Sequence, residues 1–370
     1  MAQVNSNDEG YLQLMESQNI INDQYSNIDR IDPNGGDGCF SLVFTAYDHS
    51  TKEEVILKFF HPKHLSNKDR LDRFYREGKI LEILRGEPNI LESIDTVCDL
   101  EIELTSSSTP LPIRQYYQFI PLKKAKGNVE RFIYSSLSTP EKCLIYFREM
   151  CKAVNRIHGK LICHRDLKPS NFLIFTGDDI RLGDFGTSKH LDGSMEDIRK
   201  IYIDRIGDRT YTAPEALFFE TGISDQHVYS ADIFSLGAIL FEMFSQTELY
   251  SYLYDPNNNR DYYAYLTILG RTLSSLPKKE KTEYYLKHMD YLASTVNFPD
   301  IYLFNDFVPN SIKYFLNSLY KDLTQINLFK RYHLFESVYR RINICLLILR
   351  NEEAYGRMLA KRRILRKRKN

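Results

Sequence analysis

The most informative stretch of the sequence is His164-Arg165-Asp166-Leu167-Lys168-Pro169-Ser170-Asn171. Asp184-Phe185-Gly186 begins eighteen residues after Asp166, and Ala213-Pro214-Glu215 follows later in the chain. Each motif is short, and a single three-residue match is weak evidence. Their shared order and spacing is much stronger evidence, because carboxylates and amines scattered on a solvated loop would not produce it.

Together the three motifs resemble the eukaryotic-type protein kinase family. The resemblance extends from about Tyr25 to Tyr339, and the lysine two places after Asp166 is similar to the Ser/Thr branch. It implies a bilobal α+β fold, with a small β-rich lobe over residues 25–120 that includes one helix and a larger helical lobe over residues 121–339. It also implies ATP and Mg²⁺ as cofactors, and transfer of the γ-phosphate to Ser/Thr hydroxyls of a protein substrate.

The resemblance implies a role for each polar side chain of these motifs. Asp166 would orient the attacking hydroxyl and accept its proton, and Lys168 would place a positive charge beside the transferred group. Asn171 and Asp184 would bind magnesium through their oxygens, which are the hard ligands that this ion prefers. These residue types suit phosphoryl transfer because its catalysis depends on positioning and on neutralising charge.

A lysine upstream of the motifs has an acidic counterpart on an expected helix. Lys58 ends the strand-like run Val55-Ile56-Leu57-Lys58, and Glu77 follows nineteen residues later. Glu77 lies between Phe74 and Leu81 at helical spacing, so it faces inward, where an unpaired charge is costly. We therefore expect an ion pair, and the resemblance implies that Lys58 also holds the α- and β-phosphates of ATP.

The nucleotide site implied by the resemblance begins at Gly36-Asp37-Gly38-Cys39-Phe40-Ser41-Leu42-Val43. Its glycines permit close approach of the backbone to phosphate oxygens, but Ser41 stands where the family has a third glycine. Ile56 is a second departure, since it is larger than the alanine that the family most often places against adenine. The residues expected to bind the nucleotide are Gly36, Gly38, Ser41, Val43, Ile56, Lys58 and Leu173.

Asp208 is a third departure, because Ser/Thr kinases usually have threonine at this place, near the catalytic aspartate and lysine. The acid removes no phosphate-binding group, but it puts the Ser/Thr specificity in question. The resemblance further implies that Arg331 is the buried partner of Glu215. Two alternatives to an active protein kinase stay open: a pseudokinase acting as a nucleotide-gated interaction module, and an atypical small-molecule kinase.

The hydrophobic pattern predicts strands in the first third of the chain and helices after it. Residues 40–47 and 54–60 are rich in β-branched and aromatic residues, and residues 106–110 have the composition of a loop. Asn67 and Thr139 are expected helix caps, each followed by apolar residues at helical spacing. A helix near residues 230–244 is apolar almost all round, which predicts burial. The resemblance implies that its Asp232 holds the catalytic loop by hydrogen bonds.

The ends of the chain differ in charge from its body. The 49 basic side chains balance 49 acidic ones, but the last fourteen residues carry eight basic and no acidic side chains. Residues 1–24 are expected to form a polar, mobile leader, and residues 340–370 a helical basic tail. The segment from Arg357 to Lys369 has three possible roles: binding a polyanion or acidic surface, binding the acidic body of the same molecule, or simple solvation.

Composition excludes several classes of protein. The 43% hydrophobic and 26% charged residues are typical of globular domains and exclude a wholly disordered chain or a collagen. The longest apolar run, from Ile344 to Leu349, is too short for a membrane helix, and the N-terminus lacks the apolar core of a signal peptide. The six cysteines form no C-x-x-C pair, which favours reduced thiols and a cytoplasmic location.

Overall fold

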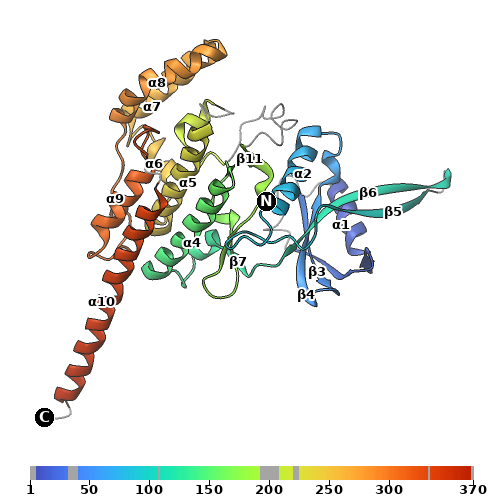
Figure 1. Cartoon of the computed structure of the whole chain (residues 1–370), viewed down its shortest axis with the longest axis horizontal. Helices are drawn as coiled ribbons and strands as arrows, with labels where there is room; N and C mark the ends of the chain where they lie inside the picture. The colour runs from blue at the N-terminus through green and yellow to red at the C-terminus, as the bar shows by residue number, and fades with distance from the viewer. Residues whose placement is uncertain are drawn as a thin grey trace. The chain divides into compact units, whose positions relative to one another are not determined.

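The chain forms two compact units, coloured by residue number in Figure 1. The first comprises residues 1–126 and 183–188, and the second comprises residues 127–182 and 189–370. The first is built on a sheet and the second on helices, so the predicted bilobal α+β class is confirmed. The computed structural model describes residues 6–31, 41–106, 109–191, 208–219, 225–331 and 334–367.

The first unit is built on a six-stranded antiparallel sheet, whose strands lie in the order β1-β2-β3-β4-β6-β5. The elements of this unit are α1 (Ser6–Glu16), β1 (Ile20–Ile21), β2 (Tyr25–Arg30), β3 (Ser41–Asp48), β4 (Glu53–Phe60), α2 (Lys68–Ile83), β5 (Cys98–Ser106) and β6 (Thr109–Lys123).

Strands β3 and β4 present two different faces because side chains alternate along a strand. One face is buried and contributes Phe44, Leu57 and other apolar side chains to the core. The other face is partly exposed, and its cross-strand register pairs Val43 with Lys58 and Thr45 with Ile56. The sheet therefore places three expected site residues, Val43, Ile56 and Lys58, on one accessible surface.

Helix α2 begins as the sequence predicts. The Asn67 side chain accepts a hydrogen bond from the amide of Arg70 and so satisfies one of the unpaired donors of the first turn. Phe74, Glu77 and Leu81 are buried along one face of the helix. This face holds Glu77 toward the interior of the first unit.

The N-terminal segment differs from the expected leader. Residues 6–24 include α1 and β1, and Leu12, Met15 and Ile21 are buried in the same core as Tyr25. The expectation of a polar, mobile leader is therefore wrong for its described part. The signal was weak because only a few apolar residues, such as Leu12 and Met15 three positions apart, mark the buried face of α1.

The expected loop over residues 106–110 is also wrong where the structure describes it. Ser106 ends β5 and pairs with Thr109, which begins β6, so the two strands form a long hairpin. Pro110 lies within β6 although it lacks an amide hydrogen. It is tolerated because β4 pairs with β6 only from Phe119 to Lys123, so the start of β6 has one neighbour and an open edge.

The second unit is mainly helical. Its helices are α3 (Val129–Ile133), α4 (Pro140–Gly159), α5 (Asp225–Ser245), α6 (Leu249–Leu253), α7 (Arg260–Ser275), α8 (Lys278–Thr295), α9 (Lys313–Leu323) and α10 (Phe335–Lys367). Its short strands are β7 (Gly127–Asn128), β8 (Ile162–Cys163), β9 (Phe172–Ile174), β10 (Ile180–Leu182) and β11 (Lys189–His190).

Helices α4 and α5 form the core of this unit. The Thr139 side chain caps α4 as predicted, and the inward stripe that includes Phe147 and Val154 is fully buried. Helix α5 is buried on nearly all sides from Ile233 to Ser245. Gly237 allows α9 to approach closely, because a Cβ atom there would lie 2.7 Å from the Cβ atom of Leu323.

Helix α10 continues beyond the packed region toward the C-terminus (Figure 1). Ile342, Cys345 and Leu346 are buried on the second unit, where α10 packs on α4 and α9. The basic segment that begins at Arg357 continues this helix as far as Lys367. In the part of the chain that the structure describes, no helix is long and apolar enough to cross a bilayer.

Candidate active site

The first unit contains the predicted ion pair together with a second carboxylate. Lys58 on β4 donates to Glu77 on α2, with its Nζ atom 2.8 Å from Oε1 and 2.7 Å from Oε2. The same Nζ lies 3.3 Å from Oδ1 of Asp184. The Glu77 side chain is 4% exposed, whereas that of Asp184 is 48% exposed. The lysine thus joins a buried carboxylate to an accessible one.

Burial and charge act in opposite directions on this group. Burial by itself would lower the pKa of Lys58, but the carboxylates of Asp184 and Glu77 raise it above its ordinary value. Burial raises the pKa of Glu77, and the positive charge of Lys58 opposes that effect. Lys58 therefore stays protonated at neutral pH and can attract an anionic ligand.

A tight turn presents the Asp184 carboxylate. Asp184 adopts a left-handed backbone conformation, with φ at 61°, which is uncommon for a residue with a side chain. Phe185 behind it is fully buried. Arg76 on α2 donates through Nη1 to the carbonyl oxygen of Gly186 at 3.0 Å. This anchor is not predicted above, and its one signal in the sequence is the position of Arg76 directly before Glu77.

The expected nucleotide residues are only partly described by the structure. Gly36 and Gly38 lie outside the described residues. Ser41 is buried at the start of β3, and Val43 and Ile56 share the accessible sheet face with Lys58. Leu173 is partly buried on β9 of the second unit.

The second unit brings the predicted catalytic-loop residues together. Lys168 Nζ lies 3.5 Å from Oδ2 of Asp166, and the Asp166 side chain is 12% exposed. Asn171 donates through Nδ2 to the main-chain oxygen of Asp166 at 2.8 Å. This bond uses the amide nitrogen and turns the amide of Asn171 so that its oxygen remains the ligand atom. The loop thus contains one carboxylate with an adjacent cation and one oriented amide oxygen.

Asp208 contacts this loop through its main chain. Its amide donates to Oδ1 of Asp166 at 2.7 Å, so Asp166 has a hydrogen-bond donor on one oxygen and Lys168 near the other. The Asp208 carboxylate accepts from the amide of Thr210 at 3.0 Å, and its carbonyl accepts from the hydroxyl of Thr212 at 2.6 Å. Asp208, which departs from the usual threonine, therefore caps its own segment and fixes this segment to Asp166.

Asp232, a buried acid on α5, holds the same loop by hydrogen bonds, as predicted. Asp232 accepts the amides of His164 and Arg165 at 2.8 and 2.9 Å, and it accepts from His158 Nε2 at 2.9 Å. Burial would raise the pKa of Asp232, but these hydrogen bonds and nearby histidines lower it below its ordinary value. Arg165 has a φ of 69°, and the bond to its amide helps to hold this strained conformation.

A second buried acid, for which no sequence pattern provides a signal, anchors the segment after Asp208. Glu242 on α5 accepts hydroxyls from Tyr211 and Tyr134, both at 2.6 Å. Ser235 donates to the carbonyl oxygen of Tyr211 at 2.8 Å. Burial raises the pKa of Glu242, and the two tyrosine donors oppose the rise. The Tyr211 side chain is therefore fixed inside the unit and has a structural role.

The predicted pair of Glu215 and Arg331 is confirmed. Arg331 Nη1 lies 2.5 Å from Oε1 of Glu215 and Nη2 lies 3.1 Å from Oε2, in a bidentate arrangement. The Arg331 side chain has no exposed surface and that of Glu215 has 5%. This pair holds the end of the segment that begins at Asp208.

Each unit presents an oxygen ligand of the kind that magnesium prefers to a soft metal's ligands. Among the described residues no group of three or more His, Cys, Asp or Glu side chains is placed to hold a metal ion. Magnesium does not need such a group, because it usually takes one or two carboxylates and completes its shell with water and phosphate oxygens. The accessible Asp184 carboxylate in the first unit and the oriented Asn171 oxygen in the second are ligands of that kind.

Known proteins match most of this chain. A family model described as the protein kinase domain matches residues 31–332. The probable serine/threonine-protein kinase MARK-C of Dictyostelium discoideum is 32% identical over 207 residues, which cover 56% of this chain and 24% of that protein.

Two further relatives are similar over comparable lengths. The ovarian-specific serine/threonine-protein kinase Lok of Drosophila melanogaster is 28% identical over 217 residues, covering 57% of this chain and 42% of Lok. The mitogen-activated protein kinase mpk-1 of Caenorhabditis elegans is 28% identical over 255 residues, covering 67% of this chain and 50% of mpk-1. The chain thus spans about a quarter to a half of the length of these curated relatives.

Proposed function

The chain belongs to the protein kinase family, and we propose that it transfers the γ-phosphate of ATP to serine and threonine hydroxyls of a protein substrate. The observation that carries the proposal is the set of contacts made by the Asp166 carboxylate. Its carboxylate is oriented by the amide of Asp208 and lies beside the ammonium of Lys168. A general base must be fixed in this way to take a proton from a hydroxyl, and phosphoryl transfer needs a cation nearby.

The residues have complementary roles in this proposal. Asp166 orients the acceptor hydroxyl and takes its proton, and Lys168 neutralises charge on the transferred group. Lys58, held by Glu77, binds the α- and β-phosphates, while Asn171 and Asp184 bind magnesium. When bound, ATP supplies the phosphoryl group and Mg²⁺ neutralises its charge.

The nucleotide is assigned to the accessible face of β3 and β4. Val43 and Ile56 supply apolar contacts there beside Lys58, and Leu173, Ser41, Gly36 and Gly38 complete the proposed set. Ile56 is the larger residue noted in the sequence, so we expect a narrower adenine site than one lined by alanine.

The test is transfer of labelled γ-phosphate from ATP to a serine- or threonine-containing peptide in the presence of magnesium. Asp166→Asn and Asp184→Asn should each lower the rate by about 10²–10⁴-fold, the range for loss of a positioned catalytic group. Asp261→Asn, an exposed aspartate on α7, is the matched control and should keep full activity. Melting temperatures of the three variants equal to that of the wild type would exclude a folding defect.

The pseudokinase alternative would replace the proposal if the wild-type chain bound a fluorescent ATP analogue but transferred no more phosphate than Asp166→Asn. Transfer to a small-molecule hydroxyl, with no transfer to any peptide, would instead favour the small-molecule kinase.

The basic C-terminal tail is proposed to contact a polyanion or an acidic surface. Its eight basic residues begin at Arg357, and six of them belong to the helix that continues as far as Lys367; Arg368 and Lys369 lie outside the described residues. Such binding proceeds by counterion release and weakens steeply with salt. Truncation after Gly356 should lower retention on heparin at low salt and change kinase activity by no more than a few-fold. Equal retention of both proteins at low salt would contradict this role.

A cytoplasmic location stays a prediction.

A further inference from the structure

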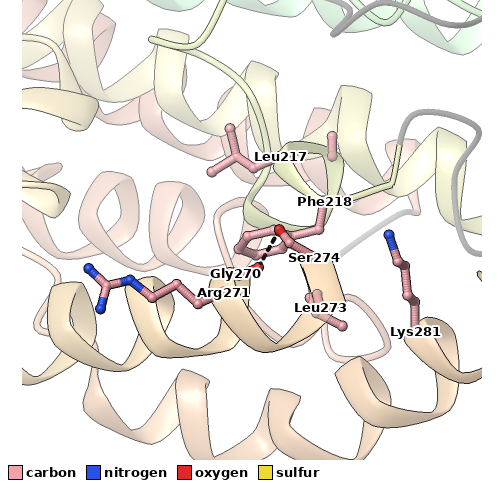
Figure 2. Close-up of a pocket in the computed structure, with 8 residues that line it drawn as sticks. Leu217, Phe218, Gly270, Arg271, Leu273, Ser274 and Lys281 are labelled. Atoms are coloured by element: carbon pink, nitrogen blue, oxygen red, sulfur yellow. Dashed lines mark hydrogen bonds between the residues drawn. The ribbon is translucent and has the colours of Figure 1, made fainter. Parts of the chain in front are cut away.

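A pocket of about 410 Å³ lies in the second unit, and none of the catalytic or nucleotide-binding residues proposed above lines it (Figure 2). It is formed by the 3₁₀ turn Pro214–Leu217 and the following Phe218, by the last turns of α7, and by the first turn of α8. Its volume is in the range of pockets that bind ligands. Phe218 and Leu273 give it an apolar surface, and Arg271 and Lys281 give it positive charge.

The two cations have no carboxylate partner among the described residues. Neither cation has an acidic neighbour at helical spacing, because no residue three or four positions before or after Arg271 or Lys281 is acidic. Other cations of this unit do pair, as Lys321 does with Asp300 at 2.6 Å and Arg341 with an aspartate at 2.7 Å. The pocket therefore carries two positive charges that its described surroundings do not neutralise.

Figure 2 shows how these charges are arranged. Arg271 extends from α7 on one side of the Phe218 ring, and Lys281 rises from α8 on the other side. The Ser274 hydroxyl is turned back to the carbonyl of Gly270, at 2.8 Å, and so does not compete for a ligand. Cations on two sides of an aromatic floor suit an extended segment with more than one carboxylate better than a single small anion.

The aromatic floor depends on Gly270, which leaves room for the Phe218 ring to lie close to α7. A Cβ atom at Gly270 would lie 3.0 Å from Cε1 of Phe218, which is closer than ordinary packing allows. Phe218 also contacts the ring of Tyr285, with 6.1 Å between the ring centroids. The pocket is therefore a preformed feature of the unit.

The pocket is also within reach of a peptide bound at the catalytic loop. The amide of Asp208 contacts Asp166, and ten residues of chain lead from Asp208 to Phe218. An extended chain spans at most about 3.5 Å per residue, so the floor lies within about 35 Å of Asp166. A substrate peptide covers that distance in about ten residues or fewer.

We propose that this pocket binds an acidic segment of the protein substrate, within about ten residues of the phosphorylated hydroxyl. The inference rests on the proposed kinase function, since it specifies the substrate of that activity. The segment's carboxylates pair with Arg271 and Lys281, and its aliphatic carbons pack on Phe218. The pocket selects substrates by their binding, and it takes no part in the chemistry at Asp166.

The test compares two pairs of serine peptides with the full chain. Each pair has three glutamates or three glutamines about eight residues from the serine, before it in one pair and after it in the other. In at least one pair the glutamate peptide should have about a tenfold lower KM, with kcat unchanged. The double variant Arg271→Gln and Lys281→Gln should remove this difference and leave the glutamine peptides unaffected.

Two further variants separate this site from a general effect of charge. Lys287→Gln removes an exposed cation elsewhere on α8 and should keep the preference. Reversal of both pocket charges, Arg271→Glu with Lys281→Glu, should transfer the preference to a peptide with lysines in place of the glutamates. Raising the salt concentration should reduce the preference of the wild-type chain.

The outcomes distinguish the two proposals. Phosphorylation of all four peptides with equal KM would overturn the acidic-segment site and leave the kinase function intact. If no peptide is phosphorylated, the kinase proposal fails, and fluorescence anisotropy of a labelled glutamate peptide decides the site by itself. Equal binding of that peptide to the wild type and to the double glutamine variant would then overturn it.

Discussion

Replacement of Arg331 by methionine tests whether the buried ion pair holds the segment that ends at Glu215. The two side chains share bidentate contacts at 2.5 and 3.1 Å and are almost completely removed from solvent. Arg331 also donates to the carbonyl oxygens of Gln325 and Ser230, at 2.9 and 2.8 Å. Methionine fills a similar volume, so the main loss is electrostatic.

The size of the loss follows from the burial. Removing one partner of a buried pair leaves an uncompensated charge and typically costs about 3–5 kcal/mol. Arg331→Met and Glu215→Gln should each lower the free energy of unfolding of the second unit by about this amount. The double variant leaves no unpaired charge, so it should lose at least about 2 kcal/mol less than the sum of the two single losses.

Urea unfolding followed by far-ultraviolet circular dichroism measures these free energies, because the second unit supplies most of the helix. The chain has no tryptophan, so dichroism is a better probe than intrinsic fluorescence. Arg341→Met is the matched control: it breaks a pair with Asp322, whose side chain is 42% exposed, and should cost less than about 1 kcal/mol. Additive single losses, or equal effects of Arg331→Met and Arg341→Met, would refute the reasoning.

Three further predictions concern the site. Glu77→Gln should lower phosphate transfer by about 10–100-fold, measured as kcat/KM for ATP, because it removes charged hydrogen bonds from Lys58, the proposed ligand of the phosphates. The folded state holds the pKa of Asp232 below its ordinary value. The ionised Asp232 carboxylate therefore stabilises the fold at neutral pH, and this stabilisation is lost as the pH falls through the lowered pKa, below about pH 4. Asp232→Asn should lose less stability than wild type between about pH 7 and pH 3, as measured by melting curves. Tyr211→Phe should lower both stability, by about 1–3 kcal/mol, and transfer, whereas Tyr134→Phe should lower stability alone, because only Tyr211 belongs to the segment fixed to the catalytic loop; equal transfer by the two variants would contradict this.

The features that could be predicted from the sequence depend on residues close together in the chain or on short motifs. The cap at Asn67, the pair of Lys58 and Glu77, and the role of Asp232 all follow from spacing or from motifs whose geometry is tied to neighbouring residues. In each case an apolar stripe or a motif fixes the direction of the polar side chain.

The parts that were missed depend on contacts between distant segments. One face of helix α1, with Leu12 and Met15, is buried because the first unit offers it a surface, and the composition of the helix gives little sign of that. The carboxylate of Glu242 depends on hydroxyls from residues 31 and 108 positions away. No periodicity records such a contact. The hairpin that contains Pro110 was missed because serine, threonine and proline favour loops unless a partner strand satisfies the backbone.

The contact between Asp208 and Asp166 has a consequence for how residues in this region are surveyed by mutagenesis. The donor is a peptide N–H, which every amino acid except proline provides, so alanine scanning leaves it in place and reports nothing about it. An amide-to-ester replacement at position 208 deletes this donor and keeps the side chain. For the same reason the side chain at position 208 can vary: an acid can replace a hydroxyl residue there while the backbone donor still orients the Asp166 carboxylate.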